Sequence, residues 1–226
     1  MLVAIPDVLT PQEVAYLRHE LETGEWMDGK ATAGGQAAAV KNNLQAPADS
    51  PVTQRLAQIV LQALARNARF TTAALPLHLT TPMFNRYDVG MTFGAHVDGA
   101  IRTATGGARV RTDVSSTLFL TPPEDYDGGE LKILDTYGEH LVKLPAGHLI
   151  VYPATSLHSV TPVTRGSRWA SVFWTQSMVK EDGRRAMLYD LDLSIMSVRE
   201  RLPDDDIAVV GLMAHYHNLL RSWCEV

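Results

Sequence analysis

Apolar residues recur at helical spacing in two stretches near the start of the chain. The first follows Thr10, a residue suited to cap a helix, with Pro11 at the first helical position and Glu13 completing a capping box. The second begins at Ser50 and ends near Asn67. A helix with one apolar stripe buries that stripe, so we expect both helices to cover one face of a sheet.

The period changes to alternation from about residue 75, and short strand-like runs are then separated by turn signals. The runs are 77–86, 93–97, 114–120, 130–134, 140–144, 148–152, 158–163 and 168–176. Such spacing favours a double-stranded β-helix, the jelly roll. Before these runs, residues 2–5 predict an edge strand, and 26–48 predict irregular chain or short strands.

Helical spacing returns after residue 178 and is interrupted once, at Pro203. The predicted fold is therefore mainly β with helical flanks. It comprises a helical and strand support region at 1–75, a jelly-roll core at 76–178 and a C-terminal helical region at 179–226. These two helices predict a small cap that packs either on the sheets or on another subunit, and the apolar residues of the last helix are consistent with a homo-oligomer formed through the C-terminal helices.

Composition narrows the classes of function. The chain has 226 residues, 46% of them hydrophobic, which is enough for a sizeable core in one large domain. Its net charge of −5 argues against a nucleic-acid partner. Cys224 is the single cysteine, so no internal disulfide is expected. No signal peptide and no membrane-length apolar run are evident, so we expect a cytoplasmic protein without a membrane partner.

Candidate chemistry gathers around His96 and Asp98. In an extended strand these two side chains point the same way and can offer two ligands to one ion. His158, much further along, can supply the third, and two histidines with one carboxylate make the facial triad of non-haem Fe(II) oxygenases. Arg168 follows, with a planar fork that suits a carboxylate. Taken singly, each is also consistent with a hydrogen-bonded core histidine or a solvated surface charge.

The wider order of residues resembles the Fe(II)- and 2-oxoglutarate-dependent dioxygenases of the prolyl and lysyl hydroxylase branch. More narrowly, it resembles the bacterial PKHD-type hydroxylases over nearly the whole chain. The motifs are Tyr87-x-x-Gly90-x-x-Phe93-x-x-His96-x-Asp98, Gly128-Gly129-Glu130-Leu131, and then His158 and Arg168.

The resemblance implies a role for each of these positions. His96, Asp98 and His158 would bind Fe(2+), Arg168 would bind the distal carboxylate of 2-oxoglutarate, and Tyr87 would contact the same cosubstrate. L-ascorbate would serve as reductant, and no catalytic side chain is expected beyond the iron centre. The implied reaction hydroxylates a small-molecule or peptide substrate, with decarboxylation of 2-oxoglutarate to succinate and a link to bacterial iron acquisition.

Two alternatives use the same residues. One is a cupin-like metal-binding or iron-sensing protein without 2-oxoglutarate turnover, and the other is a zinc hydrolase, because two histidines and a carboxylate also make a catalytic zinc site. The polar stretch 99–113 is either a substrate lid or a plain connection. Its Arg102, Arg109 and Arg111 either meet an acidic substrate or are solvated. Tyr87 either contacts 2-oxoglutarate or packs in the core, and we expect Tyr152 to pack in the core.

Overall fold

Two antiparallel sheets form the centre of the molecule, and a computed structural model describes residues 1–32, 34–103 and 107–226. The larger sheet has the strand order β1 (Val3–Ile5), β14 (Leu149–Pro153), β10 (Val114–Phe119), β17 (Arg168–Ser177), β6 (Met83–Tyr87), β4 (Leu44–Gln45) and β2 (Met27–Asp28), with β5 (Pro76–Leu79) also paired to β17. The smaller sheet has the order β13 (Gly138–Val142), β12 (Leu131–Asp135), β15 (Leu157–Val160), β7 (Thr92–His96) and β3 (Lys41–Asn42).

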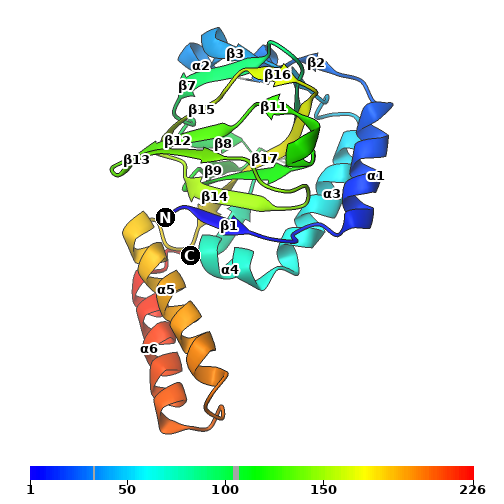
Figure 1. The fold of residues 1–226 in the computed structure, drawn as a ribbon. Coiled ribbons are helices and arrows are strands. Elements are labelled where there is room, and N and C mark those ends of the chain that lie inside the picture. Colours follow the sequence, from blue (N-terminus) through cyan, green and yellow to red (C-terminus); the bar gives the residue numbers. More distant parts are fainter. Residues whose placement is uncertain (33, 104–106) are drawn as a thin grey trace.

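Two short strand pairs and eight helices complete the part of the chain that the structure describes. The pairs are β11 (Asp127–Gly128) with β16 (Val163–Arg165), and β8 (Ile101–Thr103) with β9 (Arg109–Arg111). The α-helices are α1 (Pro11–Glu22), α2 (Gly35–Val40), α3 (Pro51–Ala65), α4 (Ala68–Ala74), α5 (Asp182–Arg199) and α6 (Ile207–Trp223), and the 3₁₀ helices are Gly29–Thr32 and Pro123–Asp125. Figure 1 shows α1 and α3 against the body of the molecule, with α5 and α6 projecting from it as a helical hairpin.

Alternation along each strand sorts side chains between the two faces of the larger sheet. On β14, Leu149 and Val151 join the core beneath α1, α3 and α4, whereas Ile150 and Tyr152 join a second core shared with the smaller sheet. The helices therefore cover the outer face, as their apolar stripes predicted. The inner face is left to meet the smaller sheet, and the candidate site lies there.

Several predicted features are confirmed. Thr10 caps α1, and the capping box with Glu13 and the proline at the first helical position are both present. The edge strand forms as β1, at the end of the larger sheet. Helices hold about 37% of the residues and strands about 31%, so the flanks contribute more residues than the central sheets do. None of the described helices is long and apolar enough to cross a membrane.

Other boundaries were wrong. The predicted strand 77–86 is two strands, β5 and β6, and Pro82 between them has no N–H to donate to the ladder. The predicted strand 158–163 is likewise two, split around Pro162. Helix α4 was missed; its cap is Asn67, whose side chain accepts a hydrogen bond from the Phe70 N–H.

Six residues of the polar stretch 99–113 lie in strands and not in a loop, because β8 and β9 pair as a hairpin. Residues 104–106, which lie between the two strands, are outside the described part of the chain.

Candidate metal centre

His96 and His158 face each other across neighbouring strands of the smaller sheet. His96 ends β7, His158 lies on β15, and the two residues are direct cross-strand partners. Their ring centroids are 4.2 Å apart. Opposed residues on antiparallel strands share one face of a sheet, which explains how two histidines so distant in sequence meet.

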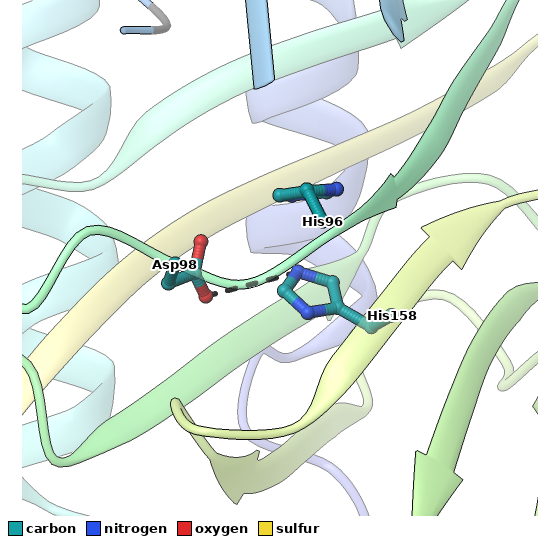
Figure 2. Close-up of side chains that lie close together, drawn as sticks. All are labelled: His96, Asp98 and His158. Carbon is teal, nitrogen blue, oxygen red and sulfur yellow. Dashed lines mark ion pairs between the residues drawn. The ribbon is translucent and has the colours of Figure 1, made fainter. Parts of the chain in front are cut away.

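Asp98 lies just past the end of β7, two residues beyond His96, and the predicted run 93–97 also ends before it. One of its oxygens, Oδ2, lies 3.7 Å from Nε2 of His158, and Figure 2 shows the carboxylate turned toward both imidazoles. The same oxygen accepts a hydrogen bond of 2.5 Å from Oγ of Ser115 on β10. This bond ties the carboxylate to the opposite sheet.

The two imidazoles are oriented by backbone carbonyls. Nδ1 of His96 donates to the Gly94 carbonyl at 2.8 Å, and Nδ1 of His158 donates to the Ser156 carbonyl at 3.0 Å. These bonds favour the tautomer in which Nε2 carries the lone pair, the usual arrangement for metal-binding histidines. Burial, and secondly the neighbouring His158, lowers the pKa of His96 to about 4, so its ring is neutral at pH 7.

The three side chains offer ligand atoms that all lie within 4.8 Å of one another. Both histidines are almost fully buried. Small side-chain rotations would bring two imidazole nitrogens and one carboxylate oxygen around a single ion. That donor set fits Fe(II), and it leaves the opposite side of the ion free for other ligands.

A cavity of about 600 Å³ opens beside this group, between the two sheets. Arg168, at the start of β17, faces into it and is only 2% exposed. It forms no ion pair with any residue that the structure describes, and its Nε is buried without a hydrogen-bond partner there. An unpaired buried cation is costly, so the site is built to receive an anionic ligand.

Tyrosines and a glycine surround this arginine. Tyr87 lines the same cavity, with its ring centroid 5.3 Å from the Arg168 guanidinium carbon, and burial raises its pKa, so it stays a neutral phenol. A Cβ on Gly129 would lie 3.1 Å from Cδ of Arg168, so the glycine leaves room for the arginine stem. Tyr152 packs in the core between the sheets as expected, and its ring meets His158 edge to face at 5.2 Å.

Comparison with known families agrees with this geometry. Residues 82–176 match the 2OG-Fe(II) oxygenase superfamily, and residues 182–225 match the PKHD-type hydroxylase C-terminal domain. A PKHD-type hydroxylase of Paracoccus denitrificans is 68% identical over the full length of both chains. The chain belongs to the PKHD-type hydroxylases.

Solved structures with the same fold are more distant. A prolyl-4-hydroxylase of Pseudomonas putida aligns with a TM-score of 0.52 at 20% identity, over 77% of this hydroxylase and 92% of that chain. HygX of Streptomyces hygroscopicus, with nickel and 2-oxoglutarate bound, aligns with a TM-score of 0.52 at 18% identity, over 80% of this hydroxylase and 84% of that chain.

This PKHD-type hydroxylase is a 2-oxoglutarate-dependent dioxygenase. Its family implies Fe(2+) and 2-oxoglutarate, and the histidine–aspartate–histidine group fits the iron. The cupin-like binder and the zinc hydrolase are therefore not supported. Among the described residues that line the cavity, Asp98 is the only carboxylate, so no second one stands ready as a hydrolytic base.

Sequence reasoning missed several residues of this cavity. Ser115 and Lys41 carried no motif: Ser115 lies on a fully buried strand, and Lys41 on a strand of two residues. The polar run Ser115 to Thr117 inside a strand with apolar ends was the one available signal. Arg102 was considered but was not assigned to the site, and the structure places it on the cavity wall.

Proposed function

We propose that His96, Asp98 and His158 hold Fe(II) and that Arg168 pairs with the distal carboxylate of 2-oxoglutarate, with Tyr87 beside it. Iron bound together with 2-oxoglutarate and O2 supplies the oxidising chemistry for hydroxylating a C–H bond, with succinate and CO2 as coproducts. L-ascorbate is the proposed reductant that keeps the iron ferrous. A substrate connected with bacterial iron acquisition is the biological context we propose.

The buried guanidinium of Arg168 is the observation that carries this proposal. It opens on the same cavity as the three candidate ligands and has no ion pair among the described residues. A small dicarboxylate can reach both places at once, with one end at the metal and the other at the arginine. The surrounding protein orients that dicarboxylate and excludes water, and the redox chemistry belongs to the iron and cosubstrate.

Anaerobic titration of the Fe(II)-loaded protein with 2-oxoglutarate tests the proposal directly. We expect a metal-to-ligand charge-transfer band, and then succinate when O2 is admitted with a substrate. Arg168→Ala should weaken 2-oxoglutarate binding by about 30-fold or more, since stranding one charge of a buried pair costs about 2–5 kcal/mol. Arg168→Lys should restore part of the loss, because a point charge cannot reproduce the bidentate fork.

The affinity for Fe(II) separates metal binding by the two histidines from 2-oxoglutarate binding by Arg168. His96→Ala and His158→Ala should lose most Fe(II) binding, whereas Arg168→Ala should keep it. The exposed Arg109, changed to alanine, is the matched control and should alter neither affinity. If Arg168→Ala bound 2-oxoglutarate like the parent protein, or lost iron as badly as His158→Ala, the assignment of Arg168 would be wrong.

A further inference from the structure

A second buried cation, Lys41, faces the cavity from the smaller sheet. It lies on β3 and is 4% exposed. Its Nζ donates to Oγ1 of Thr32 at 3.2 Å and to Oε1 of Gln45 at 3.4 Å, both neutral groups. No carboxylate among the described residues forms an ion pair with it. A lysine held this deep without a counter-charge has lost hydration that nothing nearby replaces in full.

A third cation, Arg102, lines the same cavity from the β8–β9 hairpin. Its guanidinium lies over the ring of Trp174, with the central carbon 3.5 Å from the ring centroid. Its Nε is buried without a hydrogen-bond partner, and no ion pair to a described residue neutralises it. Stacking on the indole of Trp174 fixes the orientation of the guanidinium but does not neutralise its positive charge.

The other arginines of the same hairpin differ from Arg102. Arg111 pairs with Asp113 at 2.7 Å and with Glu225 at 3.2 Å, so its charge is already matched. Arg109 is exposed, and its side chain is not part of the cavity wall. Of the three arginines that sequence reasoning left open, Arg102 alone combines partial burial, a fixed orientation and access to the site.

The charges of Lys41 and Arg102 act on each other. Burial is the larger cause that lowers the pKa of Lys41 to about 8, and repulsion from Arg102 is the next. Among the described residues, the cavity wall therefore carries three cations, Lys41, Arg102 and Arg168, and one carboxylate, Asp98. The net charge of the whole chain is −5. This local excess of positive charge opposes the overall charge of the molecule.

Bound Fe(II) and 2-oxoglutarate would neutralise only part of the positive charge in the cavity. The two positive charges of Fe(II) and that of Arg168 are balanced by Asp98 and the two carboxylates of 2-oxoglutarate. Lys41 and Arg102 remain unmatched, and a molecule as small as 2-oxoglutarate leaves much of the cavity for another ligand. The apolar side chains of Met83, Val172 and Trp174 lie on the same wall.

We propose that Lys41 and Arg102 bind an oxyanion on the substrate, so that this hydroxylase acts on an acidic molecule carrying a carboxylate or phosphate group. This inference rests on the proposed function for the place of the iron and 2-oxoglutarate. The oxyanion would anchor one end of the substrate at the two cations, and the apolar wall would hold the carbon chain whose C–H bond faces the metal. Anchoring of this kind decides which carbon of the substrate lies nearest the metal.

Equilibrium dialysis with two radiolabelled probes tests the anion site. Inorganic sulfate imitates a tetrahedral phosphate, and propionate imitates a carboxylate, so the tighter probe identifies the oxyanion. The wild-type protein is loaded anaerobically with Fe(II) and saturating 2-oxoglutarate, which occupies Arg168, and ionic strength is held constant. We expect one site per chain. Lys41→Met or Arg102→Gln should each lower the affinity for the probe by about tenfold or more. A tenfold loss corresponds to ~1.4 kcal/mol.

Matched controls use the same residue types outside the cavity. Lys30→Met and Arg109→Gln remove exposed charges from nearby segments and should leave probe binding unchanged. The Fe(II)–2-oxoglutarate band shows that each variant has kept its site. Arg102 is on a surface hairpin, so its variant tests the proposal even if the buried Lys41→Met fails to fold. Failure of both probes to bind the wild-type protein, or binding that survives both substitutions, would overturn the inference.

Failure of the proposed function can be recognised separately. If the Fe(II)–2-oxoglutarate band never forms, the proposed function is wrong. The same dialysis on metal-free Arg168→Met protein then examines Lys41 and Arg102 alone. Sulfate or propionate bound there, and lost in the double variant with Arg102→Gln, would still establish the anion site. No binding there would overturn it.

Discussion

One hydroxyl, that of Ser115, holds the Asp98 carboxylate in place from the opposite sheet. Ser115→Ala should leave the carboxylate free to turn away from the histidines. We expect an affinity for Fe(II) about tenfold to 100-fold lower, the usual cost of losing a group that orients a metal ligand. Anaerobic Fe(II) titration measures it. The control is Ser116→Ala, since Oγ of Ser116 has no hydrogen-bond partner among the described residues. Equal affinities in the two variants would show that Ser115 is only a packing residue.

The proposed anion site has its own pH dependence at the level of one residue. The pKa of Lys41 is about 8, lowered by burial and then by Arg102, while Asp28 and Asp98 act in the opposite direction. Below this pH the amine is charged and attracts the anion, and above it the charge is lost. Sulfate affinity should therefore fall as pH rises through 8 and approach that of the Lys41→Met variant, about tenfold lower. Dialysis at pH 7 to 9 measures the trend, and Lys41→Met should abolish it. A flat profile in the wild-type protein would contradict the role of Lys41.

At the scale of elements, the turn before β12 depends on a glycine. Gly128 has φ of +69°, and a Cβ there would lie 2.0 Å from the Pro162 carbonyl oxygen. Gly128→Ala should destabilise the protein by ~2 kcal/mol or more, because left-handed strain alone costs about 1–2 kcal/mol. Thermal unfolding should show the midpoint lowered by several degrees. Gly183→Ala is the control, because its Cβ would meet nothing within 4 Å and alanine favours a helix. Similar midpoints in the two variants would mean that the turn adapts.

Elements with several periods of a pattern were predictable, and very short ones were not. Capping residues and an apolar stripe located α1, and alternation located β10, β14 and β17. Strands β2, β3 and β4 have two residues each, too few to show a period, so Lys41 had no predicted place.

At the candidate site, residue types and their order pointed to His96, Asp98, His158 and Arg168, which the structure brings to one cavity. The sequence did not indicate that Ser115 bonds to Asp98, or that Arg102 stacks on Trp174. Both depend on contacts with the opposite sheet.

At the scale of the whole molecule, the α5–α6 hairpin projects away from the sheets (Figure 1). Met196, Ile207 and Val210 are large apolar side chains exposed on it. The homo-oligomer formed through these helices stays a prediction. Light scattering should report a mass above that of one chain, and Met196→Glu with Val210→Glu should reduce it to one chain without changing Fe(II) affinity. Leu141→Glu, at an exposed site on β13, is the control. A single-chain mass at all concentrations would rule out the oligomer.

The cross-strand pairing of His96 with His158 would also couple metal binding to the opening of the smaller sheet. β7 is held there by β15 on one side and by the two-residue β3 on the other. An ion bonded to both histidines would act as a clip, because these strands could not separate until it left. At a free metal concentration ~100 times the dissociation constant, ligand binding stabilises the closed form by about 2.7 kcal/mol. The bound ion would then slow the local opening of the smaller sheet. Amide hydrogens of β7 and β15 would exchange with solvent more slowly in its presence.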